Sequence, residues 1–307
     1  LYPGEQVSSG KTHYEASPLN RVEKTLAPGN SWTGSDKGVS QSYEVNTSAD
    51  GVRIWTIAAA VGSLPQSTAA YGVGTLYKNV TTDESGNRVV EFKDKEDHVV
   101  LKRVASSTTA TDGHTGWLCT YYVYDDLDNL RFVLSPLAVQ YLQAHSWTIT
   151  QAIADELCFR YEYDGKKRMI IKKVPGAGEV DMVYDNRDRL VFSQDGNQRL
   201  AHQWLVTYYD GLNRVIETGL YTDASATRQS LQTAMDGSTG SSQTPAPDDL
   251  VVSSRSGNTP AEYVARNSIT FNPGFGTGVN DAFTAYIDPN AMIYSPDGSG
   301  NGNPVPP

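Results

Sequence analysis

Cysteine, long apolar runs and basic charge are all scarce in this chain, and each scarcity narrows its class. Only two cysteines occur in 307 residues, so no network of disulfides can hold the fold together. No apolar run approaches the roughly 20 residues that a transmembrane helix needs, so we expect no membrane insertion. The 25 basic residues are outnumbered by 35 acidic ones. A chain without a basic stripe is poorly suited to nucleic acid or to an anionic membrane surface.

Recognisable catalytic and cofactor motifs are also missing. The sequence has neither a Gly-x-Ser-x-Gly elbow nor a phosphate-binding glycine-rich loop. Five histidines show no metal-ligand spacing with one another or with cysteine, and we expect them on the surface or packed inside: His13, His98, His114, His145 and His202. The sequence therefore predicts no cofactor, no metal and no enzymatic activity.

What the chain does have is tyrosine and an internal repeat. Eighteen tyrosines and a negative mean hydropathy fit many short strands with polar faces. One pattern recurs four times: Tyr-Asp, three variable residues, a long polar residue and an aliphatic one. The copies span residues 124–130, 163–169, 184–190 and 209–215. The motif residues are Tyr124, Asp125, Tyr163, Asp164, Arg168, Tyr184, Asp185, Arg189, Tyr209, Asp210 and Arg214.

Each copy predicts a β-hairpin. Tyr-Asp closes an alternating run typical of a half-buried strand, and the aspartate can accept hydrogen bonds from N–H groups two residues on. Gly165, Asn186, Gly211 and Asn213 tolerate the positive φ angles of tight turns. We expect the Asp–Arg pair to be exposed and to contribute only about 0 to 1 kcal/mol. In the first copy Asn129 replaces the arginine, and Arg131 is the expected substitute.

These motifs resemble the YD repeats of RHS-repeat proteins. The resemblance extends to segments 14–21, 27–32, 92–103 and 272–275, which look like the N-terminal region accompanying YD repeats in Bacteroidota surface proteins. It implies a mainly β fold in which YD-repeat hairpins join into a twisted, spiralling antiparallel sheet. It also implies a secreted or cell-surface location and a scaffold role, including possible toxin encapsulation. The start at Leu1 indicates a mature or trimmed fragment, whose partner would be the remainder of a parent chain with a possible C-terminal cargo.

The composition predicts four regions. Residues 1–115 form an N-terminal β region whose first 35 residues are extended, with strands expected at 41–45, 52–59, 74–80, 88–93 and 98–104. Residues 116–222 hold the YD hairpins, with a helical insertion at 136–157 that Ser135-Pro136 begins. Residues 223–249 are a linker whose first part, 224–235, can form a short helix, and 250–307 form a C-terminal β segment with a disordered tail. Asp83 to Arg88 and Asp94 to His98 are interpreted as degenerate copies of the turn.

The two cysteines occupy the same repeat position, five residues before Tyr124 and Tyr163. If each repeat is a hairpin, a return strand separates Cys119 from Cys158 by two strand spacings, roughly 10 Å. A disulfide needs Cα atoms within about 7 Å. We therefore predict buried free thiols, with a disulfide as the alternative in an oxidising compartment.

The other candidate sites for metal binding or catalysis also have simple structural interpretations. Asp125, Asp126 and Asp128 could offer oxygens to Ca²⁺, but they lack the EF-hand pattern and are more typical of a solvated turn. A hydrolase would need two carboxylates from a set that nothing in the sequence narrows: Asp155, Glu156, Asp164 and Asp185. Asp288-Pro289 shares only its first two residues with the self-cleavage element of RHS toxins.

Exposed aromatics provide the alternative to a pure scaffold. Trp117, Tyr122 and Tyr161 are the candidate contacts for glycans or surface proteins. The competing interpretation places Tyr122, Tyr124, Tyr161 and Tyr163 in a cross-strand aromatic ladder.

Overall fold

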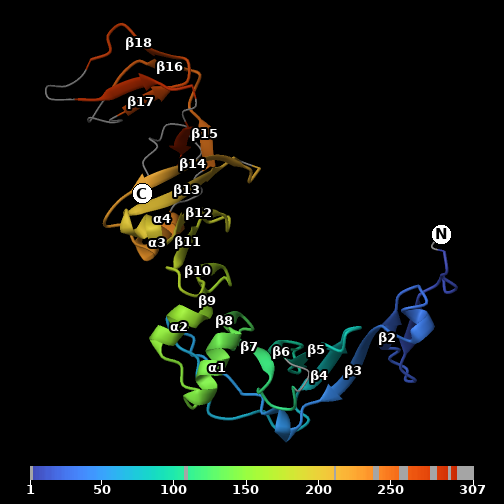
Figure 1. Cartoon of the computed structure of the whole chain (residues 1–307). Coiled ribbons are helices and arrows are strands. Elements are labelled where there is room, and N and C mark those ends of the chain that lie inside the picture. Colours follow the sequence, from blue (N-terminus) through green and yellow to red (C-terminus); the bar gives the residue numbers. More distant parts are fainter. Residues whose placement is uncertain are drawn as a thin grey trace. The chain divides into compact units, whose positions relative to one another are not determined.

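The structure is a computed structural model that describes residues 3–106, 110–210, 212–237, 242–255, 262–276, 282–289 and 292–295. The chain forms two compact units, residues 1–177 and 178–307. This division falls inside the region 116–222, whose expected boundaries stay a prediction. Figure 1 traces the strands along the chain.

The first unit contributes ten antiparallel strands. They are β1 (Lys11–Tyr14), β2 (Val22–Leu26), β3 (Val39–Val45), β4 (Tyr77–Thr82), β5 (Arg88–Lys93), β6 (Val99–Ala105), β7 (Trp117–Tyr124), β8 (Leu130–Leu134), β9 (Cys158–Tyr163) and β10 (Met169–Lys173). Within this unit each strand pairs with the next one along the chain, so the ten strands lie in sequence order. Two helices follow β8, α1 (Pro136–Ala144) and α2 (Gln151–Leu157), and two short 3-10 helices lie at Thr33–Ser35 and Ser48–Asp50.

The second unit contributes four antiparallel strands and three smaller sheets. The antiparallel strands are β11 (Val180–Tyr184), β12 (Leu190–Gln194), β13 (Gln203–Tyr209) and β14 (Val215–Thr222). The helices are α3 (Gly196–Leu200) and α4 (Arg228–Gly237). The smaller sheets pair β15 (Ser242–Pro245) with β20 (Met292–Ser295), β16 (Asp249–Val252) with β18 (Ser268–Phe271), and β17 (Glu262–Ala265) with β19 (Thr284–Ile287). The mainly β, antiparallel fold class is confirmed.

The helical insertion forms because its ends are capped. The Ser135 side chain accepts a hydrogen bond from the Ala138 N–H, and Pro136 occupies the first turn of α1. Thr150 caps α2 in the same way through the Ile153 N–H. Figure 1 shows both helices beside strands β7 to β9, where α1 packs on β7 and α2 on β9. The insertion thus covers one face of the first unit's sheet.

The core of the first unit lies on that covered face. Along β7, alternate residues Cys119, Tyr121 and Val123 are buried, as a period of two predicts. Phe132 and Leu134 of β8 continue the apolar layer. The other side of this layer is covered by the helices and by a non-strand segment, residues 51–72, which we call the strap.

Residues 52–59 are not the strand that their alternating pattern predicts. Only isolated bridges occur here, Arg53 with Ala70 and Thr56 with Gln66. The segment instead sends Val52 and Trp55 into the core. Its alternation therefore marks a strap with one buried side, because burial on one side gives the same pattern whether or not a ladder forms.

Two further regions differ from prediction. The first 35 residues contain the paired strands β1 and β2 as well as extended chain. The expected linker at 223–249 contains α4, which overlaps the short helix expected at 224–235, and also the unexpected strand β15. In α4, Leu231 and Met235 join Trp204 and Phe192 in the second unit's core, so this segment has an apolar face to bury. The expected disordered tail, from residue 296 onward, lies outside the described residues.

The strap is attached to the sheet through one tyrosine. The Arg53 main-chain N–H donates to Tyr121 Oη at 2.9 Å, and the same hydroxyl lies 2.8 Å from His114 Nε2. Tyr121 has no exposed surface, and its ring meets Trp55 and Trp147 edge to face. No helix among the described residues is long and apolar enough to span a membrane.

We predict that Tyr121→Phe lowers the free energy of unfolding by about 1 to 3 kcal/mol, because it leaves the Arg53 N–H and the His114 nitrogen without their partner. Urea denaturation followed by circular dichroism measures the change. Tyr122→Phe is the matched control, since the Tyr122 hydroxyl has no hydrogen bond within the described contacts. Equal losses in both variants would contradict the attachment.

Candidate functional site

One hydrogen-bonded turn recurs six times in the described residues. In each copy the main-chain N–H of an aspartate donates to the carbonyl four residues on, and its own carbonyl accepts from the residue three on. The side-chain Oδ1 of the aspartate accepts two more N–H groups, from the residues two and four on. The six aspartates are Asp83, Asp94, Asp125, Asp164, Asp185 and Asp210.

Asp164 shows the geometry of the turn. Its Oδ1 accepts from the Lys166 N–H at 2.9 Å and the Arg168 N–H at 3.0 Å. Its Oδ2 accepts from Arg168 Nε at 2.8 Å. One carboxylate therefore satisfies two backbone donors and closes the hairpin.

The residue three after each aspartate has positive φ. These residues are Gly86, Asp97, Asp128, Lys167, Asp188 and Asn213, with φ between 60° and 86°. At five of the six turns a shift in strand register follows, as in three-residue hairpins that end in a bulge. The expected positive φ occurs at Asn213 but not at Gly165 or Asn186, and Gly211 lies outside the described residues. The strained position is thus fixed by distance from the aspartate, and even Lys167 adopts it.

The two degenerate copies form the same turn. The turn that begins at Asp94 ends at His98, as predicted. Asp83 ends at Asn87 rather than Arg88, since Asn87 makes both the main-chain and side-chain contacts with the carboxylate. The position four after the aspartate therefore accepts asparagine, histidine or arginine.

Two of the motif tyrosines, Tyr124 and Tyr209, connect their hairpin to the preceding one. Tyr209 lies under the Arg189 guanidinium, 4.9 Å from ring centroid to Cζ, and donates to the Leu190 carbonyl at 2.8 Å. Tyr124 stacks on His98 at 4.5 Å between centroids, and its hydroxyl donates to the Val99 carbonyl at 3.4 Å. In both pairs the tyrosine contacts the last turn residue and the first strand residue of the preceding copy. At these two copies the tyrosine therefore links the turn that its own aspartate closes to the preceding turn.

This stacking replaces the expected tyrosine ladder. No ring contact links Tyr122, Tyr124, Tyr161 and Tyr163 to one another in the part of the chain that the structure describes. The expected exposure of the Asp–Arg pairs is also wrong in two cases. The Arg168 and Arg189 side chains are only 12% and 11% exposed, whereas Arg214 is 73% exposed.

A buried charge cluster joins the first YD turn to the strap. Arg131, 3% exposed, is ion-paired with the buried Glu162 and lies 3.5 Å from the Asp125 carboxylate. Glu162 in turn accepts the Gly62 N–H of the strap at 3.0 Å. Arg131 thus adds to the direct Asn129 contact, as expected, and removal of one member would leave a buried charge unpaired.

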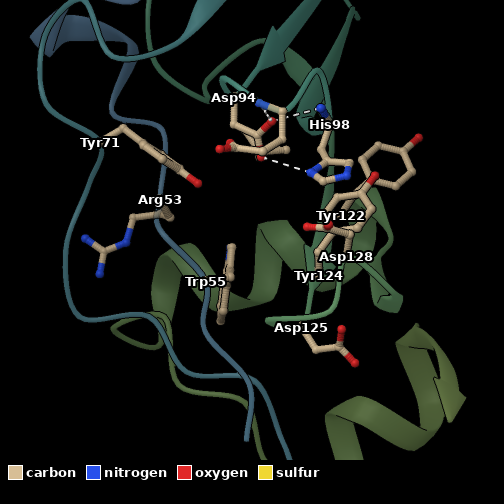
Figure 2. Close-up of a pocket in the computed structure, with 11 residues that line it drawn as sticks. Arg53, Trp55, Tyr71, Asp94, His98, Tyr122, Tyr124, Asp125 and Asp128 are labelled. Carbon is tan, nitrogen blue, oxygen red and sulfur yellow. Dashed lines mark hydrogen bonds and ion pairs between the residues drawn. The ribbon is translucent and has the colours of Figure 1, made fainter. Parts of the chain in front are cut away.

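A polar cavity of about 190 Å³ opens between the strap and two adjacent turns. Figure 2 shows Arg53, Trp55 and Tyr71 of the strap on one side, and the residues of the turns and of β7 on the other. The residues from the turns and strands are Asp94, Glu96, His98, Val100, Tyr122, Tyr124, Asp125 and Asp128. The cavity therefore combines four carboxylates with four aromatic rings of Trp and Tyr.

The carboxylates of this cavity differ in their hydrogen-bond partners. Asp94 and Asp125 are held by their own turns, whereas Glu96 and Asp128 have no side-chain partner within the described contacts. The Arg53 guanidinium points away from the cavity and donates to Ser67 instead. Burial, with Asp94 and Glu96 nearby, raises the pKa of Tyr71. The site is therefore acidic, although Arg131 lies 3.5 Å from the Asp125 carboxylate and His98 lies 3.3 Å from that of Asp94.

The aromatics chosen from the sequence do not form one site. Trp117 lies under the Arg88 guanidinium and lines a separate cavity of about 120 Å³ with Asp50, Lys78 and Arg103. Tyr122 lines the acidic cavity, and Tyr161 lines neither. Sequence reasoning missed Trp55, Tyr71 and Glu96 as lining residues. They come from segments far apart in the sequence, and no spacing pattern connects them.

The carboxylates and thiols that the sequence offers for chemistry are engaged in structural contacts or buried in the core. Asp155 pairs with Lys173, and Asp164 is occupied by its turn. No group of His, Cys, Asp and Glu among the described residues is arranged to hold a metal ion. Cys119 on β7 and Cys158 on β9 are buried and free, with β8 between them, which confirms the predicted thiols. Burial raises the pKa of Cys119 to about 11 and of Cys158 to about 12.

The comparisons with known proteins give limited matches. A family profile described as a domain of unknown function (DUF6443) matches residues 2–45, which contain β1 to β3. No curated protein matches the chain. Among solved structures, the chain is similar to "TcdB2-TccC3", with 12% identity and a TM-score of 0.39 over 71% of this chain and 11% of that one. It is also similar to a Photorhabdus luminescens Tc holotoxin pore, with 12% identity and a TM-score of 0.41 over 71% and 9%.

The chain thus spans about a tenth of the length of these structures. Similarity at this level establishes no function.

We predict that Asp164→Ala costs more stability than Arg168→Ala. The first change removes the acceptor of two turn N–H groups and should cost about 1 to 3 kcal/mol. The second leaves both N–H groups bonded and removes the ion pair of a side chain that is 12% exposed, which should cost less, about 1 kcal/mol. Asp164→Asn, which keeps one acceptor oxygen, should fall between them. Urea denaturation gives the order, and a larger loss for Arg168→Ala would contradict the dominance of the turn.

A second prediction concerns the stability of the fold at acidic pH. Burial lowers the pKa of His114 to about 4, with Arg103 and Arg53 adding to the effect. The unfolded imidazole protonates near pH 6.5. The unfolded state therefore binds the extra proton first, and the free energy of unfolding should fall as the pH drops from about 6.5 to 4. Thermal unfolding across this range measures the fall, and His114→Asn should flatten it.

The turn carboxylates act at lower pH. Burial raises the pKa of Asp125 and Asp164, but hydrogen bonds from their turns outweigh it, so each pKa lies below its ordinary value. Their contribution is present above the unfolded pKa of about 3.9 and is lost as the pH falls through the folded pKa. A second loss of stability below about pH 4 is therefore expected in His114→Asn as well. Its absence would contradict the role of the carboxylates.

Proposed function

We propose that this chain is a non-enzymatic β scaffold, a segment of a larger secreted or cell-surface protein. The observation that carries the proposal is the way the strands accumulate. Each hairpin is closed by the same carboxylate turn, and the sequence order of the strands ends on β14, which pairs only with β13 in the described residues. A sheet built in this way can be extended by further strands.

The repeat groups are used for structure. The carboxylates bind turn N–H groups, and the tyrosines at positions 124 and 209 bind the preceding hairpins. Such groups are not available as acids, bases or nucleophiles without opening a turn. This supports a scaffold over a hydrolase.

The edge strand β14 supports extension. Val215, Ile216 and Leu220 are 57%, 42% and 60% exposed along its eight residues. A long edge strand with exposed apolar residues is normally covered, because it otherwise templates pairing with another chain. The proposed natural partner is a further strand of the parent protein.

The finer form of the proposal follows the YD motifs. Their resemblance to RHS repeats favours a shell or stalk, with encapsulation or delivery of a C-terminal toxin as the more specific role. The N-terminal segments that resemble those of Bacteroidota surface proteins favour that origin. Recognition of a ligand is the second candidate, and the acidic cavity is the observation that favours it.

We predict that the chain self-associates through β14 when nothing else covers it. Ile216→Lys combined with Leu220→Lys should yield a monomer, because charges on an edge strand oppose pairing. Sedimentation velocity over a range of protein concentrations measures the effect. Leu212→Lys is the control, since Leu212 is 75% exposed but lies in the turn before the strand. A wild-type chain that stays monomeric at every concentration would contradict an adhesive edge.

A further inference from the structure

We propose that acid releases the first part of the strap, residues 52–57, from the sheet of the first unit, because its attachment requires a neutral His114. The hydrogen bonds around the Tyr121 hydroxyl lead to this inference. The release is a conformational change within the first unit, and it does not depend on the proposed scaffold role.

The attachment joins a main-chain N–H, a hydroxyl and an imidazole. The Arg53 N–H donates to Tyr121 Oη at 2.9 Å, and the same oxygen lies 2.8 Å from His114 Nε2. When the ring is neutral and its Nε2 carries no proton, the hydroxyl can accept from Arg53 and donate to His114. Both the N–H and the O–H are then bonded.

A protonated ring would break this arrangement. It carries a hydrogen on each nitrogen, so it can only donate. Tyr121 Oη would then face two donors, and its own hydrogen would need another acceptor. Within the described contacts its partners are Arg53 and His114, and Tyr121 has no exposed surface through which water could reach it. A buried donor without an acceptor is costly, so the charged ring disfavours the attached strap.

The charges around His114 also oppose its protonation. The titratable and charged groups that face it are Arg53 of the strap, Arg103 of β6, and Tyr121 and Cys119 of β7. Trp147, 5.0 Å from the His114 ring between centroids, is uncharged, and Asp112 in the same loop as His114 is exposed. Arg103 lies 3.5 Å from the Asp50 carboxylate. Burial, with Arg103 and Arg53 adding to it, lowers the pKa of His114 to about 4.

The released strap lacks this restriction. An imidazole in water takes up a proton near pH 6.5. Protonation favours the state that binds the proton better, so acid shifts the population towards release. His114 is only partly buried in the attached state, and the proton can therefore reach it without unfolding of the whole chain.

Release would uncover an apolar surface. Val52 is 1% exposed, Trp55 is 9% exposed, and both belong to the core of the first unit. Among the described residues, 52–57 form only isolated bridges, and these join them to Gln66 and Ala70 of the strap itself. The segment can therefore leave the sheet without breaking a strand ladder. The later part of the strap has its own attachment, from the Gly62 N–H to Glu162.

The test is native-state hydrogen exchange of the whole chain, followed by NMR between pH 7 and pH 4. The reporter is the Arg53 amide, whose acceptor is Tyr121 Oη. We expect its protection factor to fall about a hundredfold over this range, since the released state binds a proton near pH 6.5 and the attached state near pH 4. It should also stay below the protection factors of the β7 amides and depend only weakly on added urea, as local openings do.

Variants assign the acid response to one histidine. His114→Gln removes the titration, while the glutamine oxygen can still accept from the Tyr121 hydroxyl. The Arg53 protection factor should then be nearly independent of pH. His145→Gln is the matched control and should keep the wild-type pH dependence, because His145 is exposed and its ring stacks on Tyr141. Circular dichroism confirms that the variants fold.

Three results would overturn the proposal. The first is a protection factor of the Arg53 amide that does not change with pH. The second is a protection factor and urea dependence equal to those of the β7 amides, because the strap would then open only when the whole unit unfolds. The third is a fall of wild-type size in His114→Gln, which would assign the acid response to another group.

Discussion

The structure depends on a carboxylate that binds the N–H groups of its own turn. At Asp164, one side chain satisfies two backbone donors and leaves its second oxygen for Arg168. An exposed turn with unsatisfied donors would close a hairpin weakly, whereas this one fixes the register and the bulge together. Because the contacts are local, the same turn forms six times in different surroundings.

Turns alone would give separate hairpins, and at two copies the tyrosine before the aspartate joins its hairpin to the preceding one. Tyr209 contacts the preceding copy through Arg189 and the Leu190 carbonyl, and Tyr124 does so through His98 and the Val99 carbonyl. The last turn residue therefore closes its own hairpin and supports the next. This dual use accounts for the burial of Arg189, which an isolated hairpin would leave in water.

Sequence reasoning predicted the features set by local contacts. It located the Asp turns, the caps of α1 and α2, and the separation of the two thiols by a strand, because each follows from spacing along the chain. It placed the positive φ at Gly165, because glycine preference was given more weight than distance from the aspartate, and Lys167 adopts it instead.

Tertiary contacts were the limit of that reasoning. Residues 52–59 of the strap alternate as a strand would, and only their packing on the sheet shows that they form no strand. The acidic cavity brings Trp55, Glu96 and Asp128 together from three separate segments, and no spacing rule predicts this.

Native-state hydrogen exchange tests the central claim most directly. The amides of Asn129 and Arg168, which donate to turn carboxylates, should exchange as slowly as amides of the adjoining strands. Exchange at the rate of an exposed loop would contradict the claim, because the hairpins would then be held by their strands alone.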